Sequence, residues 1–394
     1  MATAETGNDI LADAEDSARP TSRDRRFVAE IFDGADEALT AFEAIENDLA
    51  SPAFPTIDWL TVFYEELAPA RHALPRLVVV TGGTSGEVVL ALPLVIVKEG
   101  HLRVARLADL GVAGYGIPLL GRTPLRDASS MRRAWRAVRS AMRDVDLVRF
   151  ERMPAEIGDR PNPLLALFGS ASSRASGNRL FVPGSFEDYL RSIGKKYRKD
   201  FERTRRLWQA EGSPRLYRAT TDDEIAHVFA TLEEQQAVWH AARGTPDVLA
   251  DPACRTFYER LAIDGADVGL TSLFALEAGG RVVATLFGLV HAGTFRLLAV
   301  STAGEQWSNL SPGRLVVLEV VKHLIERGVT SFDLGVNSNP LKHGFGTEEV
   351  PLYDLVIAQD IAALPTALAH EVAVHLRASR HLRAVLKKAI PRFD

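Results

Sequence analysis

The order of predicted helices and strands occurs twice along the chain, once in each half. In both halves a strand pattern precedes two helix patterns, three strand patterns, a further helix and a last strand. In the first half these segments are 27–33, 35–49, 57–67, 76–82, 87–100, 101–111, 129–144 and 145–153. In the second half they are 215–220, 222–240, 252–265, 270–280, 281–293, 294–302, 314–327 and 330–335, with one more strand at 351–358. Three hairpin-linked strands followed by a crossover helix predict a mixed sheet covered by helices, so the chain is expected to use one α/β unit twice.

The bulk numbers agree with two soluble units. A chain of 394 residues is too long for one typical core, and its formal net charge of −5 gives no general reason to expect nucleic acid as a partner. The single cysteine, Cys254, excludes an internal disulfide and a thiolate metal cluster. No apolar run reaches the roughly 18 residues of a membrane span, and the N-terminus lacks a secretory pattern. We therefore expect a cytoplasmic protein.

These patterns divide the chain into five parts. We expect a disordered tail at 1–26, an N-terminal lobe at 27–180, a basic connector helix at 181–212, a C-terminal lobe at 213–360 and a basic amphipathic helical tail at 361–394. The C-terminal pattern allows peripheral contact with an anionic membrane, although such a helix more often packs on its own domain.

A sharp break precedes the apolar helix at 314–327. Ser311 is a typical N-cap residue, and Pro312 suits the first helical position. Gly313 lowers helix propensity, and capping alone does not require it. The unpaired amides and the dipole of a helix N-terminus favour an anion such as pyrophosphate, to which Arg314 would add a charge. An ordinary turn before a buried helix is the alternative.

Five segments carry a resemblance to a known family: 51–64, 91–97, 185–207, 311–328 and 332–348. In their order and spacing the chain resembles the GNAT fold of acyl-CoA N-acyltransferases. More closely, it is similar to the CelD/BcsL acetyltransferase-like family, which is associated with bacterial cellulose biosynthesis and related to the FemA/FemX peptidyltransferases. The resembling pieces span most of the chain between its two tails.

The resemblance implies two tandem GNAT-like lobes, each a mixed β-sheet flanked by helices. Acetyl-CoA or another acyl-CoA would lie against the second lobe, with no metal. Its pantetheine arm would pair with a strand backbone like an added strand, and its pyrophosphate would meet the helix start. The implied donor-binding residues are Leu298, Ala299, Val300, Ser311, Pro312, Gly313, Arg314 and Leu315. The corresponding first-lobe region, 111–125, has no clean glycine turn into a helix, so the first lobe is expected to shape the acceptor cleft.

Direct acyl transfer needs a deprotonated nucleophile, a polarised carbonyl and a proton for the leaving thiolate. Asp333 ends a strand where the cleft should open; it either positions or deprotonates the acceptor, or it caps a turn. Lys342 stands where the family usually shows a Tyr-Lys pair, but Leu341 replaces the tyrosine. Lys342 would contact an acidic acceptor or the donor phosphates, unless it is a solvated loop lysine. His343 is a candidate base or a surface residue.

Three further residues are candidates for the acceptor side. Trp239 and His240 end a helix in the region where the family places acceptor-lining residues, although core packing of Trp239 is the more common role. Tyr353 is a candidate acid toward the thiolate, or a packing residue of its strand.

These observations predict an acyltransferase that modifies an amine or hydroxyl of a small-molecule, glycan or peptide acceptor, in polysaccharide or cell-envelope metabolism. DNA is not an expected partner. A FemX-like transferase that uses aminoacyl-tRNA is one alternative, in which the basic run 195–206 would contact the tRNA. A non-catalytic binding module in polysaccharide assembly is another, which the missing tyrosine before Lys342 leaves open.

Overall fold

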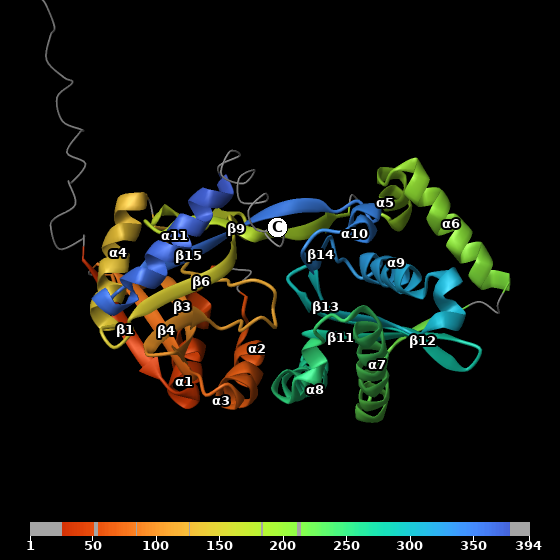
Figure 1. Cartoon of the computed structure of the whole chain (residues 1–394), viewed down its shortest axis with the longest axis horizontal. Helices are drawn as coiled ribbons and strands as arrows, with labels where there is room; N and C mark the ends of the chain where they lie inside the picture. The colour runs from red at the N-terminus through yellow and green to blue at the C-terminus, as the bar shows by residue number, and fades with distance from the viewer. Residues whose placement is uncertain are drawn as a thin grey trace, which may run out of the picture.

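The computed structural model describes residues 26–50, 54–83, 85–125, 127–182, 184–210 and 214–378 (Figure 1). Nearly all of the predicted N-terminal tail and the predicted C-terminal tail beyond residue 378 lie outside the described residues. Both copies of the predicted strand and helix order are present, which confirms the repeated α/β unit. In the first half the elements are β1 Phe27–Asp33, α1 Ala35–Ile45, α2 Ile57–Val62, α3 Ala68–Ala70, β2 Leu74–Gly82, β3 Glu87–Glu99, β4 Leu102–Leu107, β5 Leu119–Leu120, α4 Ala128–Ala141 and β6 Leu147–Pro154. In the second half they are β10 Arg215–Arg218, α7 Asp222–Arg243, α8 Pro252–Asp267, β11 Thr271–Ala278, β12 Arg281–His291, β13 Thr294–Thr302, α9 Pro312–Ile325, β14 Ser331–Val336 and α10 Pro340–Gly344.

The fold is α/β with two GNAT-like lobes, as predicted, and the sheets of the lobes join into one. This sheet has 13 strands, in the order β1-β2-β3-β4-β6-β15-β9-β14-β13-β12-β11-β10, where β9 is Ser170–Phe181 and β15 is Glu348–Ala358, and β5 pairs with β3. Helices α1, α2, α7 and α8 cover one face and share a single apolar core across both lobes. On the other face, α4 and α9 each cover one lobe (Figure 1).

Two strands, β9 Ser170–Phe181 and β15 Glu348–Ala358, are exchanged between the lobes. β9 follows β6 in the chain but pairs with β14 of the second lobe, whereas β15 follows β14 and pairs with β6 of the first. The two exchanged strands also pair with each other and run side by side between the lobes in Figure 1. Each lobe is therefore completed by a strand from the other half of the chain.

The stretch 181–212, predicted as one long connector helix, begins with the end of β9 and then forms two helices, α5 Phe186–Ser192 and α6 Lys195–Ala210. Ser185 starts α5 with a reciprocal capping box to Asp188. Ile193, which follows α5, is extended and buried. Burial of that side chain explains the break between the two helices.

Aromatic side chains join the helices of the two lobes. The rings of Trp59 in α2 and Phe257 in α8 pack edge to face with centroids 5.1 Å apart, and Phe63 meets the same ring at 6.1 Å. At the rim, the Arg260 guanidinium donates to the carboxylates of Glu65 and Glu66 at 2.7 Å each. Because these contacts and the exchanged strands join the lobes, we expect the lobes to unfold as one cooperative unit.

We therefore predict that Trp59→Ala lowers the free energy of unfolding by about 3 kcal/mol, because it removes a fully buried indole. Denaturant unfolding followed by circular dichroism should remain a single transition, shifted as a whole. The control is Val28→Ala, at a half-exposed position, which should change stability by less than about 0.5 kcal/mol. Two separate transitions, of which only one shifts, would contradict this account of the core.

Candidate functional site

Strands β13 and β14 begin side by side and then part. Their parallel pairing covers only Thr294–Arg296 and Ser331–Asp333, although β13 continues to Thr302. Against β12, Leu297 and Ala299 take consecutive register positions, so Leu298 is the extra residue of a β-bulge. A bulge bends its strand and increases the local twist. The bulge and the end of pairing together open a wedge between residues 297–302 and 334–336, called the β13–β14 wedge below.

A cavity of about 540 Å³ occupies this wedge and lies between the two lobes. Its walls come from β13, the end of β14, the last turns of α7, the start of α9, α10 and the first-lobe loop 111–114. Seven of the residues predicted from the sequence line it together: Trp239, His240, Leu298, Ala299, Val300, Gly313 and Lys342. The other predicted residues are not part of its lining.

The start of α9 differs in detail from the predicted cap. Ser311 has the left-handed φ of 50°, and its side chain makes no capping hydrogen bond, so the prediction of a side-chain N-cap is wrong. Pro312 does occupy the first helical position and is buried. The amides of Arg314 and Leu315 donate to the Ser311 carbonyl at 3.0 and 3.2 Å.

Close packing, as well as the predicted approach of a ligand, explains why residue 313 is a glycine. A Cβ atom at this position would lie 3.0 Å from Cγ2 of Thr302, because α9 starts close against the end of β13. Of the neighbouring predicted residues, Leu315 is buried in the core of the second lobe, and the Arg314 guanidinium lies 5.9 Å from the ring centroid of Phe201.

Gln236 adds an unsatisfied polar group to the wall of the cavity. Its Nε2 donates to the Val300 carbonyl at 3.2 Å, while its buried Oε1 has no hydrogen-bond partner among the described residues. Buried polar atoms are rarely left so. The sequence analysis missed Gln236, although the α7 pattern contains a signal, since it follows Ile225, Val228, Phe229 and Leu232 on the buried face.

Asp333 lies beside the wedge and joins the two lobes. The residue is 2% exposed, and its carboxylate accepts hydrogen bonds from the Tyr115 hydroxyl at 2.7 Å and from the Gly335 amide at 2.8 Å. Burial raises the pKa of Tyr115, and the Asp333 charge raises it further. Arg296 faces the same carboxylate, with Nε 3.9 Å from Oδ2. Burial lowers the Arg296 pKa, and Asp333 opposes that shift. Tyr115 comes from the first-lobe loop and was not predicted.

Lys342 places an ammonium group in the cavity wall. It lies on the short helix α10, and its Nζ donates to the carbonyls of Val336 at 2.7 Å and Asn337 at 3.0 Å. An ammonium has three donors, so one remains after these bonds. Burial lowers the Lys342 pKa, and the negative charge of Asp333 acts in the opposite direction.

The other candidates lie at the rim or elsewhere. His343 is part of α10 but is not in the lining; its Nε2 is 2.9 Å from the Ser338 hydroxyl. Tyr353 lies on β15 between Met153 and Ser172, in the first-lobe part of the sheet. Trp239 is 41% exposed, so the expectation of core packing is wrong. The Arg243 guanidinium stacks on its ring at 4.1 Å.

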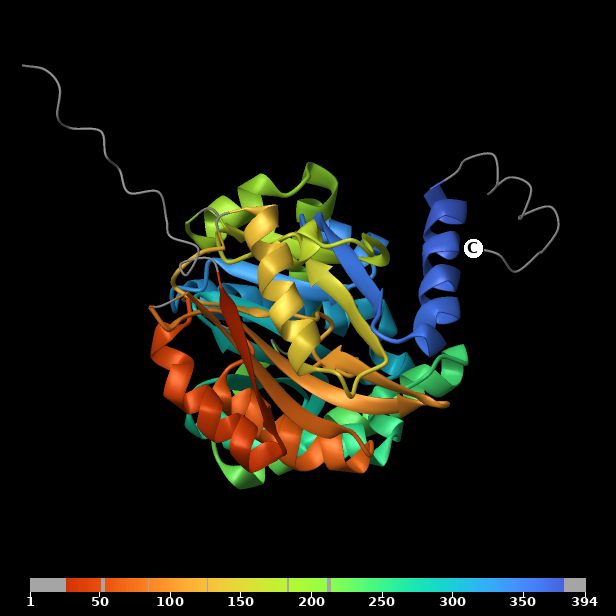
Figure 2. The same cartoon turned by 90° about the vertical axis from the view of Figure 1, so that its left-hand side faces the viewer.

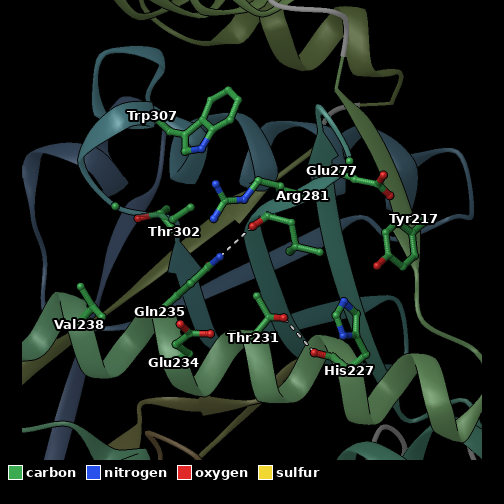
Figure 3. A pocket seen from close by; sticks show the side chains of 14 residues that line it. Tyr217, His227, Thr231, Glu234, Gln235, Val238, Glu277, Arg281, Thr302 and Trp307 are labelled. Carbon is green, nitrogen blue, oxygen red and sulfur yellow. Dashed lines mark hydrogen bonds between the residues drawn. The ribbon is translucent and has the colours of Figure 1, made fainter.

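A second cavity, of about 740 Å³, lies between α7 and the hairpin of β11 and β12, and Thr302 lines both cavities. Figure 3 shows the Arg281 guanidinium pointing into it between Trp307 and Thr302, away from Glu277. Within the described part of the chain, this side chain has no ion pair or hydrogen bond. The Trp307 ring stacks on Trp208 with centroids 5.2 Å apart.

The equivalent place in the first lobe is filled by the chain itself. Strands β4 and β6 also pair in parallel over a short stretch, Val104–Ala105 with Leu147–Val148. Beyond it, the Gly116 amide donates to the Glu151 carbonyl at 3.2 Å, and a Cβ atom on Gly116 would lie only 2.6 Å from that oxygen. The two copies of the unit therefore differ: one holds a cavity and the other holds a loop.

Comparison with known proteins agrees with this geometry. Residues 195–343, from the start of α6 to α10, match the family described as acetyltransferase (GNAT) domain. This part of the chain is therefore similar to a GNAT domain. This match includes every second-lobe residue that lines the β13–β14 wedge except Phe345. No protein of curated function matches the sequence.

Several solved structures share the fold across both lobes. The crystal structure of FemX aligns with a TM-score of 0.56 and 11% identity, over 83% of this chain and 98% of that one. A conserved protein of unknown function from Bacteroides thetaiotaomicron VPI-5482 has a TM-score of 0.53 and 10% identity, over 81% and 97%. The C-terminal domain (DUF2156) of a putative lysylphosphatidylglycerol synthetase from Agrobacterium fabrum has a TM-score of 0.50 and 12% identity, over 87% and 98%. At these identities the likeness concerns the fold alone.

The depressed pKa of Lys342 predicts a pH dependence of stability. Its folded pKa lies below the ordinary value of 10.5, so between the two values the unfolded chain binds more protons than the folded chain. Stability should therefore rise with pH across that window, and Lys342→Met should remove this rise. The measurement is urea unfolding at a series of pH values up to about 10.5. Lys98→Met, at an exposed position, is the control. Parallel pH profiles for the wild type and Lys342→Met would contradict the prediction.

Proposed function

We propose that the β13–β14 wedge binds an acyl-CoA and that the chain transfers its acyl group to an amine or hydroxyl acceptor. The parting of β13 from β14 at the Leu298 bulge carries this proposal. Beyond Arg296 the β14-side edge of β13 faces a cavity instead of a strand. An extended pantetheine arm has amide groups that can pair with such an edge, and the Gln236 side-chain carbonyl, which has no partner among the described residues, could accept from one of them after a small rotation of the side chain.

In the proposed reaction the acceptor nitrogen or oxygen attacks the thioester carbonyl carbon. The new C–N or C–O bond forms, the C–S bond breaks, and the proton lost by the nucleophile ends on the CoA thiol. The remaining Lys342 N–H can stabilise the negative charge that develops in the transition state. No metal takes part in this transfer. Asp333 acts as a positioning residue, because both of its described hydrogen bonds hold protein groups.

The acceptor would enter from the side of the first lobe. The first-lobe loop 111–114 and the rings of Trp239 and His240 form that part of the cavity. We propose an acetyl or other small acyl group and, following the CelD/BcsL resemblance, an acceptor in polysaccharide or cell-envelope metabolism of the cytoplasm. Membership of the CelD/BcsL family remains a prediction.

The first test separates the two reasons for Gly313. Gly313→Ala should weaken acetyl-CoA binding by about tenfold, measured by calorimetry, because a methyl group would stand at the proposed pyrophosphate site. Thr302→Ser removes the Cγ2 atom that the new methyl group would meet and should itself bind normally. The double variant should stay weak. Recovery in the double variant would mean that Gly313 serves packing only, and no binding by the wild type would overturn the donor proposal.

The second cavity supports a place for the nucleotide end of the donor. A pantetheine arm that leaves the wedge past Thr302 meets Arg281 and Trp307. We expect Arg281→Gln to weaken CoA binding by about tenfold, as loss of a charged hydrogen bond does, while binding of 3′-dephospho-CoA changes little. Arg136→Gln, on the exposed side of α4, is the control. An equal loss for both ligands would assign Arg281 no role at the 3′-phosphate.

A transferase that takes its acyl group from an aminoacyl-tRNA is the second candidate. Two observations favour it: the fold is that of FemX, and α6 turns Lys195, Lys196 and Arg203 to solvent near α10, where Tyr197 packs against Gly344. Aminoacyl transfer with a charged tRNA mixture, abolished by ribonuclease, together with no turnover of any acyl-CoA, would favour this candidate. Binding of either donor without turnover would favour a non-catalytic module.

A further inference from the structure

The C-terminal helix, α11 Leu364–Ala378, presents an apolar patch to solvent. Leu364, Leu368 and Val372 follow one another at four-residue spacing and are 46%, 57% and 55% exposed. Phe168, on the loop before β9, is 85% exposed and lines the same groove as Leu364 and Leu368. These four residues, called the α11 patch below, gather large apolar side chains in one place, whereas single exposed apolar residues are common on any surface.

The α11 helix rests on the first lobe through small side chains. Ala363, directly before the helix, is buried, and Ala367 of α11 is partly buried against the same cluster, which contains Leu102, Leu147 and Val356. Beside this contact a groove of about 1,240 Å³ separates α11 from β9 and the end of β15. Figure 2 shows the helix at the edge of the first lobe, with one long side turned away from the rest of the fold. The patch residues therefore border this groove and stay exposed, whereas the packing contact with the domain is made by Ala363 and Ala367.

The chain that follows α11 indicates what covers the patch. Residues 379–394 contain five Lys or Arg residues and one Asp, although the whole chain has a net charge of −5. An apolar helix face next to a cluster of cations is the pattern that binds anionic lipid surfaces. A symmetric contact between two copies through this patch would bring two cationic segments together, which is unfavourable. Among the described residues, no helix is long and apolar enough to cross a bilayer.

We propose that the α11 patch docks the protein on an anionic phospholipid surface. The four apolar side chains would enter the headgroup region. This inference does not depend on the acyl-transfer proposal, because no residue of the patch lines either cavity of the second lobe. It concerns where the protein works and not which donor it uses.

The test is co-sedimentation of the full chain with vesicles of one part phosphatidylglycerol to three parts phosphatidylcholine, and with vesicles of phosphatidylcholine alone. We expect binding to the first kind only, weakened by salt. Leu368→Ser with Val372→Ser should weaken it by about tenfold or more, because apolar burial contributes much of such binding. The matched control is Val28→Ser with Val268→Ser, since these residues have similar exposures of 50% and 58% elsewhere on the surface. A chain ending at Ala378 should lose the dependence on phosphatidylglycerol.

Three results would overturn the proposal. One is the absence of wild-type binding to the anionic vesicles at low salt. Another is equal binding by the patch variant and its control. The third is a concentration-dependent dimer, seen by light scattering, that is lost only in the patch variant, which would identify a second copy as the occupant. Calorimetry with acetyl-CoA on the same variants should give unchanged binding, which separates this test from that of the donor site.

Discussion

The exchange of β9 and β15 between the lobes is the constraint on which the rest of the structure depends. A strand that leaves the first lobe completes the second, and the last strand of the second completes the first. Across this junction Arg296, Asp333, Arg179 and Glu348 occupy consecutive register positions on four neighbouring strands, with charges of alternating sign. Opposite charges on neighbouring strands stabilise a register, so this row favours one alignment of the exchanged strands.

The same junction explains why the wedge stays open. On one side of the wedge, β14 pairs with β9, and the Asn178 side-chain amide donates to the Gly335 carbonyl at 2.9 Å. On the other side of the wedge, β13 stays paired with β12 on both sides of the Leu298 bulge. β14 is thus held by β9 and β13 by β12. The wedge between β13 and β14 cannot close unless some of the hydrogen bonds to these outer strands are lost. Tyr115 locks the arrangement, since its hydroxyl bonds Asp333 and its ring lies against Gly177, where a Cβ atom would come within 2.6 Å of the hydroxyl.

The sequence predicts the repeated elements well and their exchange not at all. Apolar periodicity marks β2, β3 and α9 because each buries its own apolar face, and that burial is a local property of the pattern. β9, with the sequence SASSRASGNRLF, has no such pattern; it is a strand because β14 and β15 supply partners on both sides. For the site, the GNAT resemblance implied Leu298, Ala299 and Val300, and the break before α9 indicated Gly313. Tyr115 was not predicted because it reaches Asp333 across 218 residues.

The two copies of the unit differ in what occupies the space where their parallel strands separate. In the second lobe the bulge turns the chain away, and small or apolar side chains leave a cavity beside the start of α9. In the first lobe Gly116 lets the backbone approach Glu151 so closely that no side chain or ligand fits between them. The described part of the first lobe therefore has no cavity at this place. Its loop instead positions Tyr115 against Asp333 and residues 111–114 in the wall of the second-lobe cavity. One copy therefore supplies part of the wall of the cavity that the other copy opens.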